Sequence, residues 1–282
     1  MSSADGRLHV HKFIKTMKQT ELLNECMHFS EVTSNKVEID SSMSVIPETG
    51  TDEKKFIHGI IFEYAVHCAF TKDRWENNNV WKKFTVLYPN MEQKKKKQYQ
   101  TFMYKAGRVA WDIFYTNVKT VYGRKEKSIR PLFEHTILNK NLPILTKTLV
   151  ADIFVSSLPN IVCEIKYSTM DKARYEQEYL VHAIIQVLIY SLALHLEPST
   201  LHLQILVFFS RTAEVVLYES NVHNNETLVN RLLNQLGGTN EVAEESDVRK
   251  GKNPKESEKA FTAGKDKNLT TPEEELDVID HE

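Results

Sequence analysis

The stretch LVADIFVSSLPNIVCEIKYST, residues 149–169, places three charged side chains in two otherwise apolar segments. Segments 149–155 and 161–167 are rich in Val, Ile, Phe and Tyr, which favours β-strands. Ser, Pro and Asn between them favour a turn. The sequence therefore predicts an antiparallel hairpin whose strands carry the charged residues.

The length of the turn predicts which residues face each other. If Val155 pairs with Ile161, counting back places Asp152 opposite Glu164, with Cβ atoms about 4.5–5.5 Å apart. Two carboxylates so placed among apolar neighbours repel, and a cation between them removes the conflict. Lys166 shares the face of Glu164, because side chains alternate along a strand. One face thus offers two carboxylates and one ammonium group.

A simpler interpretation treats Glu164 and Lys166 as an exposed pair on a half-solvated sheet, with Asp152 at a strand end. The neighbouring residues argue against it, because apolar side chains fill most positions on both strands. They leave little room for a solvated face.

The order Asp152, spacer, Glu164-x-Lys166 resembles the PD-(D/E)xK nuclease superfamily, and the surrounding motifs are similar to its RecB-like exonuclease branch. Glu63, four residues after Gly59, resembles the acidic residue of the first motif of that family. The resemblance implies an α/β fold with a restriction-endonuclease-like core, in which helices flank a mixed central β-sheet.

Two further residues match the Gln-xxx-Tyr signature of the helix that follows Glu-x-Lys in these enzymes, Gln186 and Tyr190. Because they are four residues apart, they project from one face of a helix. They would contact the same nucleotide as Lys166 or orient that lysine. Glu134 resembles an acidic residue on the preceding strand of these enzymes, and we expect no catalytic role for it.

The resemblance implies that Asp152, Glu164, the carbonyl of Ile165 and Glu63 hold Mg²⁺ or Mn²⁺. These hard cations prefer oxygen ligands. His58 lies near Glu63, but a lone histidine at such a place is more simply structural than a metal ligand.

Lys166 is implied to orient or deprotonate the attacking water. A lysine that is partly desolvated beside a metal is expected to have a lowered pKa, which suits a base near neutral pH.

Three cysteines, Cys26, Cys68 and Cys163, stand far apart in the chain. Some RecB-like nucleases carry a four-cysteine iron–sulfur cluster, and this spacing predicts none here. Scattered cysteines fit a reducing compartment.

Three regions are predicted from composition. Residues 1–55 form an N-terminal helical extension and linker, and residues 56–237 form the nuclease-like domain. Residues 238–282 have few large apolar side chains and many charges, which predicts a disordered tail. Predicted helices span 11–27, 56–70, 98–119, 171–194 and 225–236; segments 201–209 and 213–218 are predicted strands, and 80–88 a strand or extended loop.

The formal net charge is −2, but the charge is segregated along the chain. Lys and Arg far outnumber Asp and Glu between residues 93 and 130, which predicts a phosphate-binding surface. A solvated helix face, or a nuclear-import signal at 94–97, explains any single lysine equally well. The acidic end of the tail is a candidate mimic of nucleic acid that binds this surface. The predicted contacts are Lys94, Lys95, Lys96, Lys97, Lys105, Arg108, Arg124, Lys125 and Arg130.

These features favour a Mg²⁺-dependent nuclease that acts on DNA rather than RNA, as an exonuclease or end-processing enzyme in recombination, repair or replication. A catalytically inactive nuclease-like module that binds nucleic acid or a protein partner is an alternative, and an RNA endonuclease is another. No apolar run approaches the roughly 20 residues that span a bilayer, and no secretory signal is expected. The sequence predicts a soluble intracellular protein of nucleus or cytoplasm, with the mitochondrion and an oligomeric form left open.

Overall fold

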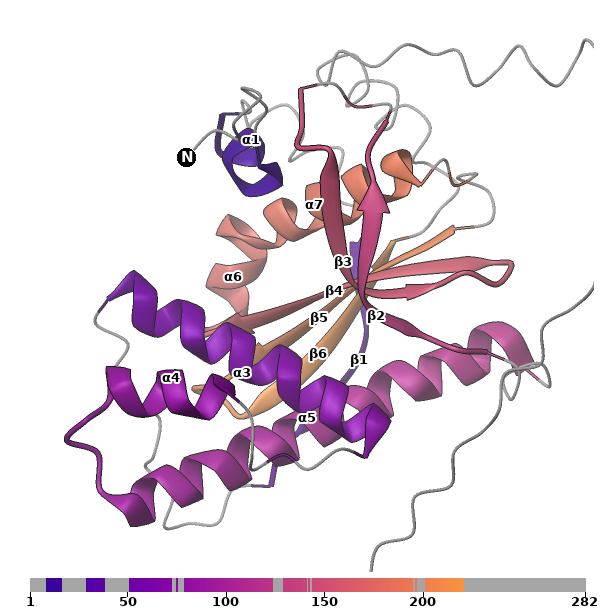
Figure 1. Cartoon of the computed structure of the whole chain (residues 1–282). Helices are drawn as coiled ribbons and strands as arrows, with labels where there is room; N and C mark the ends of the chain where they lie inside the picture. Colours follow the sequence, from indigo (N-terminus) through magenta and orange to yellow (C-terminus); the bar gives the residue numbers. More distant parts are fainter. Residues whose placement is uncertain are drawn as a thin grey trace, which may run out of the picture. The chain divides into compact units, whose positions relative to one another are not determined.

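In the computed structural model, a six-stranded sheet has the strand order β1-β6-β5-β4-β3-β2 (Figure 1). Strands β4 and β5 are parallel, and every other neighbouring pair is antiparallel. The strands are β1 (Phe29–Lys36), β2 (Leu132–Leu138), β3 (Thr148–Val155), β4 (Asn160–Ser168), β5 (Leu201–Phe209) and β6 (Glu214–Ser220). The helices are α1 (Val10–Thr16), α3 (Asp52–Thr71), α4 (Asn79–Leu87), α5 (Gln93–Tyr122), α6 (Lys172–Glu178) and α7 (Leu180–Ala193).

The structure describes residues 9–16, 29–38, 51–72, 75, 79–123, 129–140, 142, 144–194, 196 and 201–220. All of these belong to one unit, Met1–Asn240, and a second unit, Glu241–Glu282, lies outside the described residues. The predicted helix 225–236 and the predicted tail 238–282 also lie outside them. None of the described helices is long and apolar enough to cross a membrane.

Helices cover both faces of the sheet (Figure 1). Side chains alternate between the faces along a strand. Along β5, Ile205 and Val207 pack with residues of α1, α6 and α7, whereas Leu206 and Phe208 pack with residues of α3, α4 and α5. The predicted α/β fold with a mixed sheet flanked by helices is confirmed at this level.

Two predicted elements are wrong, and in addition β1 lies within the region 1–55 that was expected to be a helical extension and linker, where it pairs with β6 at the edge of the sheet. Residues 80–88 were expected to be extended, yet α4 occupies them, because Trp81 and Phe84 lie three residues apart and are both buried on one helix face. The single helix expected over 171–194 is two helices, since Tyr179 has φ −125° and ψ −25° and separates α6 from α7. Helix α5 is longer than the predicted 98–119 at both ends.

Helices α3 and α5 make close contact at Gly107. A Cβ atom there would lie 2.4 Å from the backbone carbonyl carbon of Ala65. We expect Gly107→Ala to destabilise the fold by about 1–3 kcal/mol, because the helices must separate. Gly59→Ala is the control: no atom lies within 4 Å of the added Cβ, so it should gain up to about 1 kcal/mol from helix propensity. Urea unfolding of both variants measures this, and shifts of the same sign would contradict it.

Candidate active site

The hairpin of β3 and β4 has the predicted register, with Val155 paired to Ile161. The pairing ends at Ile153 and Cys163, one step before Asp152 would reach its predicted partner. Upstream of that point β3 still pairs with β2, and these two strands diverge from the rest of the sheet (Figure 1). The direct pairing predicted for Asp152 is therefore wrong: this residue lies at a fork where β3 leaves β4.

At the fork, Asp152 directs its carboxylate toward β4. Its Oδ2 accepts a hydrogen bond from the amide N–H of Ile165 at 2.6 Å. Burial raises the pKa of Asp152, and the charge of Lys166 and this hydrogen bond offset the rise only in part. Asp152 is thus fixed to the residue whose carbonyl the family resemblance implies as a metal ligand.

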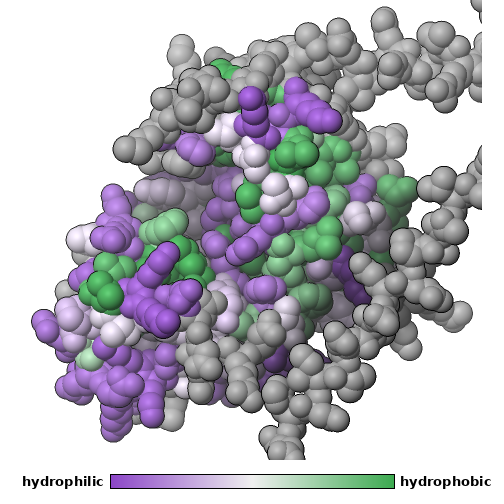
Figure 2. All heavy atoms as spheres, in the orientation of Figure 1, coloured by the Kyte–Doolittle hydropathy of each residue, from purple (hydrophilic) through white to green (hydrophobic). Residues whose placement is uncertain are grey.

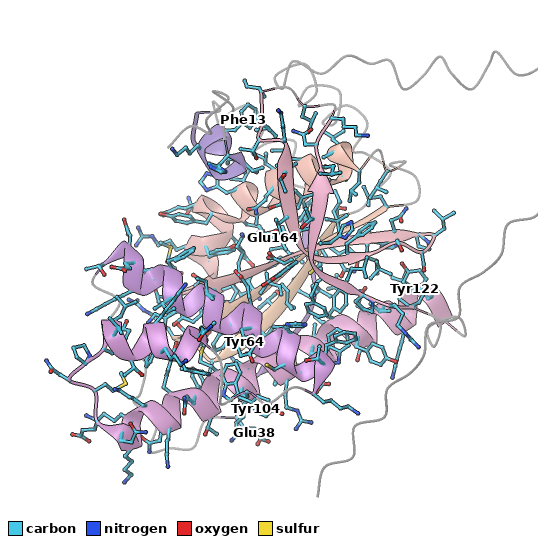
Figure 3. All side chains as sticks on the ribbon, in the orientation of Figure 1. Phe13, Glu38, Tyr64, Tyr104, Tyr122 and Glu164 are labelled. Carbon is cyan, nitrogen blue, oxygen red and sulfur yellow. The ribbon has the colours of Figure 1, made fainter. Side chains whose placement is uncertain are left out.

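Glu164 is the centre of a hydrogen-bonded network close to the middle of the sheet (Figure 3). Its Oε1 accepts hydrogen bonds from Lys166 Nζ and from Gln186 Nε2, the latter at 2.6 Å. Gln186 Oε1 accepts from Lys166 Nζ at 3.2 Å, and Gln186 Nε2 also donates to the Tyr190 hydroxyl at 2.7 Å. This is the geometry expected if Gln186 and Tyr190 orient Lys166.

The second carboxylate oxygen of Glu164 differs from the first. Oε2 is buried and has no hydrogen-bond partner among the described residues. Burial and the nearby charge of Asp152 raise the pKa of Glu164 to about 8. A buried acceptor left unpaired costs about 1–3 kcal/mol. Oε2 is therefore a suitable ligand for a hard cation.

Lys166 faces these carboxylates with 31% of its side chain exposed. Burial alone would lower its pKa, but the negative charges of Glu164 and Asp152 outweigh burial and raise it. The lowered pKa expected from the sequence is therefore wrong for the protein without a cation. The reason is that the attraction between the ammonium group and two carboxylates raises the lysine pKa by more than burial lowers it.

Glu63 approaches the same site from α3. Burial raises its pKa to about 8, the charges of Asp152 and Glu134 add to the rise, and Lys166 opposes it. Full ionisation of Glu63, Asp152 and Glu164 beside one lysine would leave two uncompensated negative charges. One divalent cation would balance them.

The fit to a metal ion rests on this donor set. Across the described ranges, no three His, Cys, Asp or Glu side chains form a ready-made metal site. The chemistry of the donors nevertheless fits Mg²⁺ or Mn²⁺, because they are carboxylate oxygens and Oε2 of Glu164 is unpaired.

His58 is structural, as expected. It is 0% exposed, and burial lowers its pKa to about 4. Its Nδ1 is hydrogen-bonded to the Tyr99 hydroxyl, and its Nε2 lies 2.8 Å from the Tyr88 hydroxyl. Because both ring nitrogens are engaged, neither is available to a metal.

Two residues near the site had no functional role in the sequence interpretation. Glu134 is exposed and has φ +47°, a left-handed conformation that is uncommon for a residue other than glycine. Tyr175 on α6 is buried near Lys166 and Glu164, whose charges affect its pKa. Because Tyr179 separates α6 from α7, no helical spacing in the sequence relates Tyr175 to Gln186, and no local signal indicated it.

The predicted basic surface lies mostly on α5. Lys94, Lys95 and Lys97 are exposed in its first turns, where Figure 2 shows hydrophilic side chains gathered at the lower left. Lys96 and Lys105 are partly exposed, and Arg108 and Arg130 are exposed. Lys95 lies 3.9 Å from Glu92, and Arg130 donates a hydrogen bond to the carbonyl of Ile129. Arg124 and Lys125 lie outside the described residues.

Comparison with known proteins identifies no family. No family model matches the chain, and no curated protein shows significant similarity to it. A solved structure titled "Crystal structure of SSO0001" aligns with 17% identity over 63% of this chain and 83% of that chain, with a TM-score of 0.25. A match at that level carries no argument about fold or function, so function must be argued from the site itself.

Proposed function

We propose that this protein is a metal-dependent nuclease that resembles the RecB-like branch of the PD-(D/E)xK superfamily and has a restriction-endonuclease-like core. Its substrate in this proposal is DNA, and its role is that of an exonuclease or end-processing enzyme in recombination, repair or replication. The observation that carries the proposal is the convergence of Asp152, Glu164 and Lys166 at the fork between β3 and β4.

The carboxylates would hold the cation. Asp152 and Glu164 are the ligands, with the Ile165 carbonyl beside them and Glu63 as a further contact from α3. Mg²⁺ or Mn²⁺ supplies Lewis-acid polarisation of the scissile phosphate and a lowered pKa for a bound water. The raised pKa values of Glu63 and Glu164 support this assignment, because a cation relieves the repulsion that raises them.

Lys166 would act beside the cation in its protonated form. Gln186 holds its ammonium group through a 3.2 Å hydrogen bond, and Tyr190 in turn binds Gln186. A charged donor fixed in this way can orient the attacking water or stabilise negative charge on the phosphate. Removal of a proton from water by Lys166 would require the charge of the cation to lower the lysine pKa.

The exposed lysines and arginine of α5 would contact the phosphate backbone. Such contacts position the substrate without reading its sequence, and they weaken as salt concentration rises.

A catalytically inactive module that binds nucleic acid or a protein partner is the second candidate. One observation favours it: Oε1 of Glu164 already accepts hydrogen bonds from Lys166 and Gln186. In that case the network would be structural.

Cleavage of end-labelled single- and double-stranded DNA separates the two candidates. We expect the natural chain to cut DNA with Mg²⁺ or Mn²⁺ and not with EDTA. Asp152→Ala and Lys166→Ala, made separately, should each reduce the rate at least about 100-fold while binding survives. Binding without cleavage by the natural chain would favour the inactive module. Cleavage by both variants at the rate of the natural chain would mean that the activity does not depend on Asp152 or Lys166, which would also favour the inactive module.

A further inference from the structure

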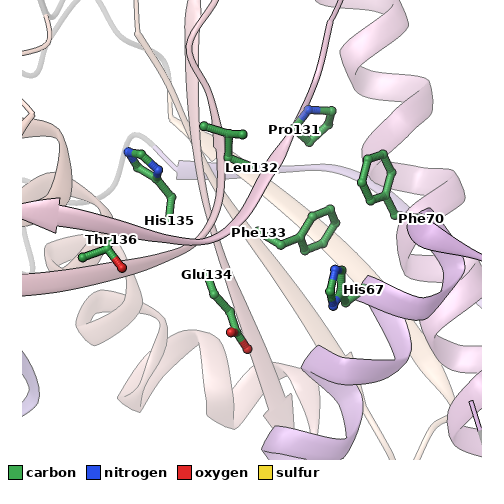
Figure 4. Close-up of a pocket in the computed structure, with 8 residues that line it drawn as sticks. All are labelled: His67, Phe70, Pro131, Leu132, Phe133, Glu134, His135 and Thr136. Atoms are coloured by element: carbon green, nitrogen blue, oxygen red, sulfur yellow. The ribbon is translucent and has the colours of Figure 1, made fainter. Parts of the chain in front are cut away.

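A pocket of about 340 Å³ lies between α3 and β2 (Figure 4). Its lining includes His67, Phe70, Phe133 and Glu134. The volume is at the lower end of the roughly 300–1,000 Å³ typical of small-ligand sites. Glu134 lies on β2 between Phe133 and His135, which pair with Ile153 and Ala151, the residues on either side of Asp152 on β3. The pocket therefore adjoins the candidate active site.

Aromatic side chains continue from this pocket onto α5. The ring of Phe70 lies 5.0 Å from Phe133 and 5.0 Å from Trp111, and Trp111 stacks on Tyr115 at 5.5 Å. We call these four residues the aromatic strip. Each of them is partly exposed. They come from α3, α5 and β2, so the tertiary fold, rather than one segment, assembles the strip.

Positive charge flanks the aromatic strip. Lys119 Nζ lies 4.6 Å from the centre of the Tyr115 ring, and Arg108 precedes Trp111 by three residues on the same side of α5. Neither Arg108 nor Lys119 forms a salt bridge with another described side chain. Asp112 is the opposing charge on this stretch of α5.

Partly exposed aromatic rings interleaved with cations are features that bind single-stranded nucleic acid, because unpaired bases stack on the rings while phosphates contact the cations. A duplex hides the faces of its bases. Trp111 and Phe133 also pack against the hydrophobic core, which fixes their rings in place while part of each stays open to a ligand.

We propose that the aromatic strip and its pocket bind unpaired bases of a single-stranded nucleic acid and lead the strand to the carboxylates at the fork. This inference rests on the proposed nuclease function and specifies its substrate as a single strand or an unpaired end. A stacked base contributes about 1–3 kcal/mol, so loss of one ring should weaken binding about tenfold.

Binding of two oligomers of equal length and charge tests the inference, with EDTA present so that no cleavage occurs. One is oligothymidylate and the other is an abasic strand, which has phosphates but no bases. Trp111 is the reporter, because stacking changes its fluorescence, whereas Trp75 and Trp81 are only 9% and 5% exposed. The natural chain should bind oligothymidylate at least about tenfold more tightly than the abasic strand. Equal affinities would overturn the inference, and this comparison needs no variant.

Variants then locate the binding. Phe133→Leu should lose about tenfold in affinity for oligothymidylate, measured by anisotropy of a labelled strand, and keep its affinity for the abasic strand. Trp111→Leu should behave in the same way, and Trp111→Phe should restore binding. Unchanged affinity in both leucine variants would overturn the inference.

Cleavage with Mg²⁺ is measured separately. Base-dependent binding without cleavage would refute only the nuclease function, and cleavage without base-dependent binding would refute only this inference.

Discussion

Lys166→Met is expected to abolish cleavage and to destabilise the protein more at pH 8 than at about pH 6. Methionine preserves much of the length of the side chain but removes the ammonium group that faces Glu164 and Asp152. Without it, two carboxylates share a buried site with no positive charge. Breaking a buried ion pair costs about 3–5 kcal/mol, and the partial exposure of Lys166 places this change near 3.

The sign of the pH effect follows from the carboxyl pKa values. Glu164 and Asp152 have raised pKa values in the folded protein, and loss of Lys166 raises them further. Below their folded pKa values they are protonated, so the lysine has little charge to neutralise and its loss costs little. As pH rises, ionisation makes the loss costly.

Urea unfolding at the two pH values measures this difference, and end-labelled DNA measures cleavage. Lys55→Met is the matched control: Lys55 is exposed, pairs with exposed Asp52 at 3.3 Å, and its loss should change stability by less than about 0.5 kcal/mol. Equal destabilisation of the two variants at both pH values would contradict the assigned role of Lys166.

Divalent cations are expected to stabilise the protein strongly near pH 8 and weakly near pH 6. The pKa values of Glu63 and Glu164 are raised to about 8 in the folded protein, so the folded state holds protons that the unfolded state releases. Their contribution to stability is present at low pH and is lost as pH rises toward 8. A cation that binds the ionised carboxylates reverses that loss, and protons compete with it at lower pH.

Melting temperatures in EDTA and in millimolar Mg²⁺ or Mn²⁺ across this pH range test the linkage. In EDTA the melting temperature should fall from about pH 6 to pH 8, and the cation should remove most of the fall. Glu164→Gln should flatten the profile in EDTA and respond less to the cation, because it cannot ionise. A cation effect that is as large in this variant as in the natural chain would place the binding site elsewhere.

Much of the sheet was predictable because residue composition and turn chemistry are local signals. They placed β3 and β4 and their register correctly at Val155 and Ile161. Helix α4 was not predicted, since its short apolar pattern at Trp81 and Phe84 fits both a strand and a helix, and packing on α3 decides between them.

The site was predictable in its members and not in its geometry. Motif order identified Glu164, Lys166 and Gln186, which the structure brings into direct contact. The fork at Asp152 depends on where two strands separate, and no local pattern encodes that. The direction of the Lys166 pKa shift depends on a balance of burial against charge, which only three-dimensional distances determine.

The central claim is that Glu164 serves cleavage rather than folding, and Glu164→Gln tests it most directly. Glutamine retains an oxygen that can accept the hydrogen bonds of Lys166 and Gln186, and it removes the charge that would bind the cation. Cleavage in Mg²⁺ and DNA affinity in EDTA should be measured on the same preparations. The proposed nuclease predicts a cleavage rate at least about 100-fold lower with nearly unchanged affinity. Cleavage at the natural rate by Glu164→Gln would contradict it.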